Sequence, residues 1–278
     1  MMLANLNDVL LPAKEKGYAV GLFNTCSLEF ARGVIEAAEE MNSPVIIGTA
    51  EIFLHLASLE MMADMLLPMA ERASVPVVVH LDHGLTEETC LRALELGFTS
   101  IMYDCSVFPY EENVQRVAEM AAKAHAKGVT IEGELGHVAD NEGSGAVDDP
   151  SAYYTLPEEA ADYVSRTKID ALAVAVGTAH GAYKFPPKLD FERIHRISDI
   201  TGIPLVLHGG SGLTDDDFRR AIKEGIQKIN IFTDINHAGA KAAYEAYASG
   251  KELLTDLQPL MVKAIREETV KKMKVFMS

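Results

Sequence analysis

Val77-Val78-Val79-His80-Leu81-Asp82-His83-Gly84 joins an apolar, β-branched start to a polar end. Such a run, preceded by Val75-Pro76, is typical of a buried strand. The two imidazoles and the carboxylate at its end need partners, because burying unpaired polar groups is costly. Polar residues at the carboxyl tip of a parallel strand are typical of the active face of a barrel enzyme. The stretch therefore predicts a strand and a candidate site together.

Strand-like and helix-like segments alternate along the whole chain. Eight segments have the composition and length of strands: Tyr18–Phe23, Pro44–Gly48, Val75–Leu81, Thr99–Tyr103, Val129–Gly133, Ala171–Val176, Pro204–Leu207 and Lys228–Phe232. Helical spacing and capping residues predict the following helices: Leu28–Met41, Leu59–Ala73, one after the N-cap Thr86, Glu111–Lys127, Pro157–Arg166, Phe191–Ile200, Asp215–Glu224, Asn236–Ala248 and Pro259–Phe276. Eight strands alternating with helices predict an α/β protein, a closed (β/α)8 TIM barrel with extra C-terminal helices.

An open, doubly wound sheet is the alternative fold. Such a sheet concentrates polar strand ends at one switch point, whereas here they follow the third to the eighth strand. No linker or low-complexity segment interrupts the 278 residues. We therefore expect residues 1–278 to form a single barrel domain.

Charge, cysteine content and hydropathy limit the classes of function. The chain has 25 basic and 41 acidic residues, and its net charge of −16 argues against a nucleic-acid or anionic-membrane partner. The three cysteines, Cys26, Cys90 and Cys105, are odd in number and widely spaced, which argues against a disulfide framework. Met1–Asn5 lacks the basic start of a signal peptide, and no apolar run approaches the roughly 18 residues of a membrane span. These features predict a soluble, cytoplasmic protein.

Four of the nine histidines follow or end predicted strands: His80, His83, His180 and His208. A single histidine at a rim is more often just hydrogen-bonded there. Three that converge on one mouth of a barrel, together with carboxylates at neighbouring strand tips, favour a catalytic zinc site with an open fourth position. His80 precedes the tip of its strand and is expected only to support Asp82.

Three carboxylates belong to the same predicted mouth. Asp82 is next to His83 and points the other way if the backbone is extended there, so it can face a substrate without binding the metal. A carboxylate beside a Lewis acid suits general acid/base chemistry. Glu134 and Asp104 either form a second cation position, for a divalent or a monovalent ion, or orient the histidines.

A glycine-rich turn, His208-Gly209-Gly210-Ser211-Gly212, follows the seventh strand. Glycines let backbone N–H groups approach an anion, and the Ser211 hydroxyl adds a donor. The end of the eighth strand supplies further groups from Asn230, Ile231, Phe232 and Thr233, and Gly181 follows His180 in the same way. Loops after strands seven and eight form the usual phosphate site of such barrels, so we expect a phosphate here.

Met61, Met65 and Met69 recur every four residues on one predicted helix. Such an apolar stripe is typical of a core or subunit face. Together with the C-terminal helices it predicts a homo-oligomer, a homodimer or a homotetramer.

These motifs together resemble the class II, metal-dependent ketose-bisphosphate aldolases, and the resemblance covers nearly the whole chain. It rests on Phe23-Asn24, Ser43-Pro44-Val45-Ile46, His80-Leu81-Asp82-His83, Glu111-Glu112-Asn113, Glu132-Gly133-Glu134-Leu135-Gly136, Gly177-Thr178-Ala179-His180-Gly181, Leu207-His208-Gly209-Gly210-Ser211-Gly212 and Lys228-Ile229-Asn230-Ile231.

The resemblance implies reversible cleavage of a ketose (bis)phosphate, of the tagatose- or fructose-1,6-bisphosphate type, to dihydroxyacetone phosphate and an aldehyde such as glyceraldehyde 3-phosphate. It implies Asp82 as the catalytic proton donor and acceptor, and Glu142 as a lid carboxylate for proton exchange at the ketone-derived carbon. The implied zinc ligands are His83, His180 and His208, with Glu134 and Asp104 as an alternative metal position. The residues implied to bind dihydroxyacetone phosphate are Gly181, Gly209 to Ser211 and Asn230 to Thr233.

Several positions depart from the family pattern. Cys26-Ser27 stands where an Asn-containing segment is common, Tyr103-Asp104-Cys105-Ser106 replaces Ile-Asp-Gly/Ala-Ser, and Ala139-Asp140 replaces a Gly-Gly pair. Gly177-Thr178-Ala179-His180 is closer to the tagatose-bisphosphate branch, and Gly84 to the fructose-bisphosphate branch. No arginine of the C-terminal helices is assigned to a second phosphate, so the aldehyde half of the substrate stays open.

Three other functions compete with a metal-dependent aldolase. A Schiff-base aldolase needs a desolvated lysine, but the sixth strand has none, Lys228 enters the eighth strand from the wrong end, and Lys184 lies in a loop. Another zinc-dependent barrel enzyme, such as a hydrolase, would not need the glycine-rich loop. A non-catalytic partner subunit is expected to lose ligands, whereas Asp82 and all three histidines are present.

Overall fold

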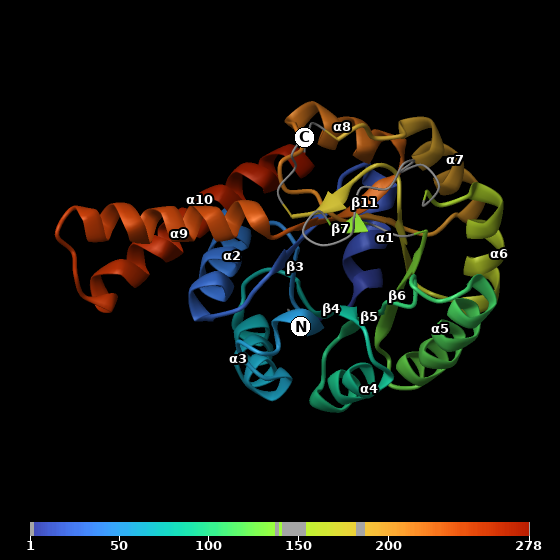
Figure 1. Ribbon diagram of the computed structural model, residues 1–278, viewed down its shortest axis with the longest axis horizontal. Coiled ribbons are helices and arrows are strands. Elements are labelled where there is room, and N and C mark those ends of the chain that lie inside the picture. Colours follow the sequence, from blue (N-terminus) through green and yellow to red (C-terminus); the bar gives the residue numbers. More distant parts are fainter. Residues whose placement is uncertain (1–2, 137–138, 141–153, 182–186, 278) are drawn as a thin grey trace.

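Eight parallel strands close into a barrel in the computed structural model, which describes residues 3–136, 139–140, 154–181 and 187–277. The barrel strands are β2 (Val20–Asn24), β3 (Val45–Ala50), β4 (Val77–Gly84), β5 (Ser100–Tyr103), β6 (Thr130–Leu135), β8 (Ala171–Val174), β10 (Leu205–Leu207) and β11 (Ile226–Ile231). They follow one another around the barrel in chain order, and the last strand, β11, pairs with the first, β2, to complete the circle (Figure 1). The predicted TIM barrel is confirmed.

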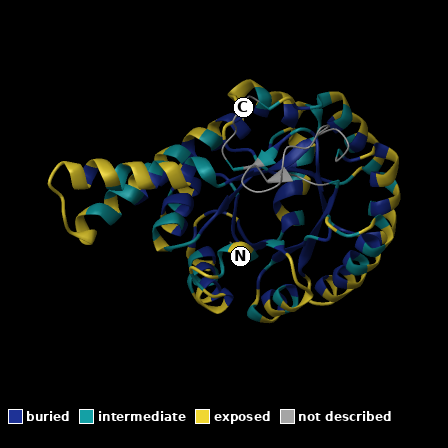
Figure 2. Ribbon diagram, in the orientation of Figure 1, coloured by how far each residue is buried: buried dark blue, intermediate teal, exposed yellow. Residues whose placement is uncertain are grey.

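A ring of helices surrounds the strands (Figure 1). It consists of α2 (Leu28–Met41), α3 (Leu59–Arg72), α4 (Glu87–Leu96), α5 (Tyr110–His125), α6 (Pro157–Thr167), α7 (Phe191–Thr201) and α8 (Asp215–Glu224). Each turns a buried face to the strands and an exposed face outward (Figure 2). The Thr86 hydroxyl accepts from the Thr89 N–H at the start of α4, as its sequence signal predicts. No helix among the described residues is long and apolar enough to cross a membrane.

One helix escaped the sequence analysis. α1 (Leu6–Lys16) follows the short strand β1 (Leu3–Ala4), which pairs with β4 at its amino-terminal end. Asn5 and Asp8 form a capping box at its start. Its buried residues pack with side chains inside the barrel, so α1 closes the end opposite to the strand tips. Pro12 lies inside this helix and weakens its helical signal.

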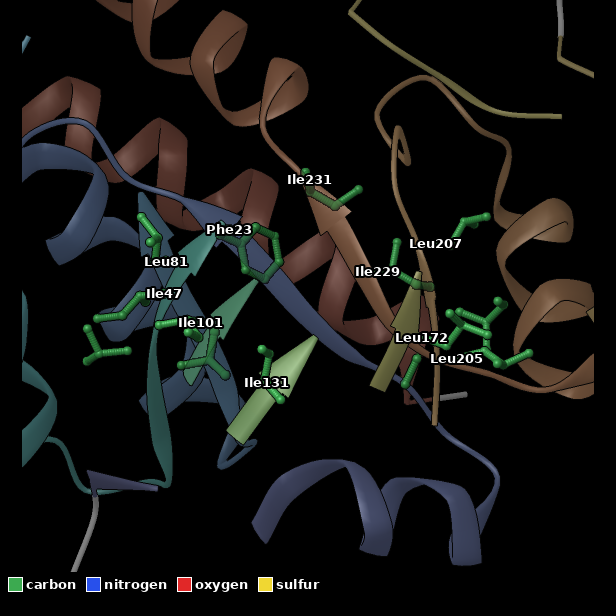
Figure 3. Packing of buried hydrophobic residues seen from close by; sticks show 14 of the residues in the cluster. Phe23, Ile47, Leu81, Ile101, Ile131, Leu172, Leu205, Leu207, Ile229 and Ile231 are labelled. Carbon is green, nitrogen blue, oxygen red and sulfur yellow. The ribbon is translucent and has the colours of Figure 1, made fainter. Parts of the chain in front are cut away.

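Alternation along the strands divides the core into two parts. Phe23, Ile47 and Leu81 belong to the cluster between strands and outer helices, and Figure 3 shows how such side chains gather around the strands. Leu22 and Ile46, one position away, belong instead to the cluster inside the barrel. Apolar side chains therefore fill the part of the barrel interior that lies toward the amino-terminal ends of the strands. Inward positions nearer the carboxyl ends carry polar residues instead.

Two long helices complete the chain. α9 (Thr233–Ala248) and α10 (Leu254–Phe276) form a hairpin that projects from the barrel beside α2 (Figure 1). Both helices begin earlier than predicted. α9 begins at Thr233 rather than Asn236. α10 begins at Leu254 rather than Pro259, because the helix accommodates Pro259 in its interior. The remaining elements are η1 (Glu51–Phe53), β7 (Ala139–Asp140) and β9 (Ala179–His180), and the last two pair in parallel.

Gly33 allows α10 to approach α2 closely. A Cβ atom at this position would lie 2.6 Å from Ile265 Cγ2 and 3.0 Å from the Val262 carbonyl oxygen. We predict that Gly33→Val lowers the free energy of unfolding by about 2 kcal/mol, because the added side chain overpacks this contact. Urea unfolding followed by circular dichroism measures the loss. Gly33→Val should lower the free energy of unfolding by less in an Ile265→Ala background than in the wild type. An equal decrease in both backgrounds would contradict the steric explanation.

Candidate active site

The carboxyl ends of the strands carry a connected group of polar side chains. On β4, Val78, His80 and Asp82 occupy alternate positions, so the inward face changes from apolar to polar toward the strand tip. The same change occurs on β6, where Glu132 and Glu134 are both buried. Parallel strands in a closed barrel bring these tips to one mouth.

Asp82 is held between two amides. Asn24 Nδ2 donates to Asp82 Oδ2 at 2.7 Å, and Asn230 Nδ2 donates to Asp82 Oδ1 at 3.0 Å. Burial raises the pKa of Asp82, but His83 and Lys228 outweigh this effect and hold the pKa well below its usual range. The Oδ1 atoms of both asparagines are buried and have no hydrogen-bond partner among the described residues. They are acceptors suited to a substrate hydroxyl next to an ionised Asp82.

His83 bends the end of β4. Its φ of 41° lies in the left-handed region, which a residue other than glycine adopts at a cost of about 1–3 kcal/mol. This backbone places the imidazole beside Asp82, so the two side chains share the mouth instead of pointing apart as simple alternation suggests. Asp104, which follows β5, accepts a hydrogen bond from His83 Nδ1 at 2.8 Å.

His83 and His208 turn nitrogens toward each other, with His83 Nε2 2.7 Å from His208 Nδ1. The other nitrogen of each ring faces a carboxylate at 2.8 Å, Asp104 for His83 and Glu132 for His208. Ionised carboxylates only accept hydrogen bonds, so these ring nitrogens carry the hydrogens. The two facing nitrogens, 2.7 Å apart, can share one proton in a hydrogen bond, and without that proton both lone pairs are available to a metal ion. Histidines oriented by carboxylates are the usual ligands of metal ions, so the residues fit a metal site.

The pKa values of the two histidines report the same need for a cation. Burial alone would lower the pKa of His83, but Asp82 and Asp104 raise it to about 10. Burial and the neighbouring His83 charge lower the pKa of His208 to about 4. One positive charge is thus favoured at the two rings, and a divalent ion held by them would supply that charge in place of the proton.

Two overlapping groups of side chains can hold this ion. Asp82, His83 and His208 each offer a ligand atom within 4.8 Å of the others, and so do His83, Asp104 and Glu134. Asn113 Nδ2 donates to the Glu134 carbonyl oxygen at 3.0 Å and thereby fixes this end of β6. The groups share His83, so they describe two neighbouring positions for a cation.

A buried layer under these ligands was not assigned to the site from the sequence. Glu132 accepts from His208 with Oε1, and its Oε2 lies 2.8 Å from Lys228 Nζ, in an ion pair rather than an aligned hydrogen bond. Burial raises the pKa of Glu132, but Lys228 lowers it to about 2. Burial and Lys228 lower the pKa of His80 to about 3, and His80 Nδ1 lies 2.8 Å from Ser100 Oγ.

The signal for this layer was present in the alternation of the strands. Glu132 lies two residues before Glu134, and Lys228 lies two residues before Asn230. Lys228, expected at the wrong end of its strand, in fact points into the barrel and reaches β6 on the other side. The side chain of Asn230 contacts Asp82, whereas Ile231 packs in the outer core, so only its backbone can serve a substrate.

The glycine-rich turn lies against the start of α9. A Cβ atom at Gly209, where φ is 65°, would lie 2.3 Å from the Ala179 carbonyl oxygen, so the close approach requires glycine. Ser211 Oγ accepts from the N–H groups of Phe232 and Asp234 at 3.2 and 3.3 Å. Because α9 begins at Thr233, its positive amino-terminal end lies at this turn, which strengthens the case for an anion site.

Two predicted residues cannot be placed. Glu142 lies outside the described residues, and so does the side chain of His180, whose backbone forms part of β9. Gly181 follows with a φ of 83°. The described part of the site therefore contains two of the three predicted histidine ligands.

Comparison with known proteins agrees with this geometry. The model of the family described as "Fructose-bisphosphate aldolase class-II" matches residues 4–278. The chain belongs to the class II fructose-bisphosphate aldolase family. Members are carbon–carbon lyases that use a divalent metal ion and act on sugar phosphates. The aldolase prediction is confirmed over the hydrolase and the non-catalytic subunit.

The relatives cover nearly the whole chain. A probable fructose-bisphosphate aldolase of Bacillus subtilis is 40% identical over 281 residues, which span 99% of this chain and 98% of the relative. The fructose-bisphosphate aldolase of Staphylococcus aureus is 40% identical over 283 residues, with the same coverage. The crystal structure of the YdjI aldolase from Escherichia coli K12 has a TM-score of 0.89 and 38% identity over 99% of this chain and 97% of that one.

Asp104 is predicted to orient His83 for the metal. Replacing Asp104 by Asn keeps the size of the side chain but removes the charge that favours hydrogen on His83 Nδ1. We expect Asp104→Asn to weaken Zn²⁺ binding about 10- to 100-fold, as measured by competition with a chromogenic chelator. Asp162→Asn, the same substitution at an exposed carboxylate that pairs with Arg166 on the outer surface, serves as the matched control. Unchanged affinity in Asp104→Asn would show that the contact does not support metal binding.

Proposed function

We propose that the protein is a zinc-dependent aldolase that reversibly cleaves a ketose 1,6-bisphosphate, of the fructose or tagatose type, to dihydroxyacetone phosphate and glyceraldehyde 3-phosphate. The observation that carries the proposal is the meeting of His83, His208 and Asp82 at the mouth of the barrel, beside a glycine-rich turn and a helix amino terminus. His180 is proposed as the third zinc ligand. Nitrogen donors favour zinc over calcium or magnesium.

Asp82 is proposed as the group that moves the proton. It takes the proton from the C4 hydroxyl during cleavage and returns it during condensation. Asn24 on β2 and Asn230 on β11 each donate to one carboxylate oxygen of Asp82 and so fix its orientation. The Oδ1 atoms of these two asparagines are proposed to accept hydrogen bonds from substrate hydroxyls. When bound, a divalent cation supplies Lewis acidity at the substrate carbonyl oxygen. Glu142 is proposed to exchange a proton at the ketone-derived carbon.

The turn after β10 is proposed to bind the phosphate of dihydroxyacetone phosphate. Gly209 and Gly210 leave room for the phosphate to approach the backbone of the turn, and the Ser211 hydroxyl lies at the start of α9. Thr233 offers the first N–H group of that helix, and Phe232 precedes it as the N-cap residue. Gly181 is proposed to border the same phosphate. Lys272 of α10 lies 2.6 Å from Asp234 Oδ2 and brings one positive charge near this end.

The function is tested by offering fructose and tagatose 1,6-bisphosphate to the purified protein and measuring glyceraldehyde 3-phosphate in a coupled assay. We expect cleavage of at least one of them, loss of activity on treatment with a chelator, and recovery when Zn²⁺ is added back. Asp82→Asn, which keeps the size of the side chain but removes its charge, should lose at least about 100-fold in kcat while it still binds Zn²⁺. A chelated protein that stays fully active, or an active Asp82→Asn variant, would refute the proposal.

We further propose a homodimer or homotetramer of one-domain chains in the cytoplasm. Two exposed apolar surfaces support self-association. Met61 on α3 is 64% exposed, although Met65 is partly buried. The tip of the α9–α10 hairpin exposes Tyr244, Leu253 and Leu254 by 74%, 64% and 65%. The free thiols of the cysteines fit a reducing compartment.

The two surfaces make separate predictions about assembly. If the hairpin tip joins the subunits, Leu253→Glu with Leu254→Glu should reduce the mass measured by light scattering to that of a monomer, because two charges replace two apolar side chains. If α3 joins them, Met61→Glu should have this effect instead. A wild-type mass of a single chain, 30.2 kDa, would refute the proposed oligomer.

A further inference from the structure

Lys228 is a cation enclosed in the barrel interior. Its side chain and that of Glu132 are both fully buried, and Lys228 Nζ lies 2.8 Å from Glu132 Oε2. The two residues come from β11 and β6, which are separated around the barrel by β8 and β10, so the pair spans the interior. A buried ion pair is weak support for stability, because desolvation offsets its attraction. Its position suggests another role.

The two oxygens of Glu132 have different partners. Oε2 faces Lys228, and Oε1 accepts from His208 Nε2 at 2.8 Å. His208 in turn directs Nδ1 toward His83 at the metal position. Lys228, Glu132 and His208 thus form one row, in which the first residue lies under the site and the last reaches it. The second oxygen of Glu132 is also 3.8 Å from His80 Nε2, which places His80 beside this row rather than in it.

We propose that Lys228 is a positioning residue for the metal centre, which acts through Glu132 to fix the orientation and tautomer of His208. Lys228 holds one oxygen of Glu132 and keeps the carboxylate in place as an acceptor. Glu132 then retains the hydrogen on His208 Nε2, so that Nδ1 is available to the metal. This role is distinct from Schiff-base chemistry, because Lys228 lies beneath the ligands and its ammonium is paired.

The other histidine shows why this support matters. His83 is oriented by Asp104, which lies near the surface and also accepts from the Ser106 N–H at 3.0 Å. Glu132 has no backbone donor in its described hydrogen bonds, and Lys228 takes that place. Removing Lys228 would leave a buried carboxylate whose remaining hydrogen-bond donor is the His208 imidazole. The Glu132 side chain would then turn or take up a proton, and His208 would lose its fixed acceptor.

The test is a double-mutant cycle on metal affinity. Wild type, Lys228→Met, Glu132→Gln and the double variant are compared by chelator competition with Zn²⁺, and by the visible spectrum of the Co²⁺-substituted protein. We expect Lys228→Met to weaken Zn²⁺ binding about tenfold and to alter the Co²⁺ spectrum. In the Glu132→Gln background the same substitution should change affinity less than twofold, because the residue through which it acts is already altered.

Lys14→Met is the matched control, since Lys14 donates to the carbonyl oxygens of Gly202 and Ile203 at the opposite end of the barrel. It should leave Zn²⁺ affinity unchanged. If Lys228→Met does not fold, Glu132→Gln is compared with the double variant, in which neither charge of the pair is left, and the Zn²⁺ affinities of the two should differ less than twofold. Wild-type affinity in folded Lys228→Met, or an equal further loss in both backgrounds, would overturn the inference.

The inference rests on the zinc site of the proposed function, but the two fail differently. A wild-type protein that binds no divalent ion would refute the zinc site. A wild-type protein that binds Zn²⁺ normally, with Lys228→Met unaffected, would refute only the role of Lys228.

Discussion

The pairing of β11 with β2, the last and the first strand of the barrel, closes the barrel, and the site depends on this closure. Asp82 of β4 accepts hydrogen bonds from Asn24 of β2 and Asn230 of β11, so it is held by the two strands that meet at this closure. An open sheet would leave β2 and β11 at separate edges and would hold Asp82 from one side only. In the closed barrel, β10 also lies across the mouth from β4 and brings His208 to His83. The metal position is therefore a consequence of topology before it is a consequence of side-chain chemistry.

The fold was predictable because it depends on periodic signals. Apolar runs of strand length alternate with amphipathic segments, and α2 and α8 have the predicted bounds. α1 was missed because a short helix with Pro12 inside has a weak signal, although its packing inside the barrel stabilises it. The early start of α9 was missed because Phe232 provides no side-chain cap that the sequence would reveal.

The site was predictable in its composition but not in its contacts. Strand tips identified His83, His208 and Asp82, because buried strands rarely end in such residues. The alternation rule failed at His83, whose left-handed φ turns the imidazole toward Asp82, and no residue type in this stretch announces that bend. Glu132 and Lys228 were missed for another reason. They lie one layer below the tips, and only the strand register shows that a residue of β11 meets one of β6.

The charges of the described site explain why it suits a divalent cation in a strongly acidic protein. Asp82, Asp104 and Glu132 have lowered pKa values, so all three are ionised near neutral pH. Lys228 offsets one of these charges, and His80 stays neutral because burial lowers its pKa. Two negative charges remain before Glu134 is counted, in an interior where unpaired charge is costly. A divalent ion held by His83 and His208 would neutralise them. The local charges of these side chains, rather than the net charge of −16, thus favour binding of a metal ion at the mouth of the barrel. A bound metal ion would in turn attract an anionic substrate.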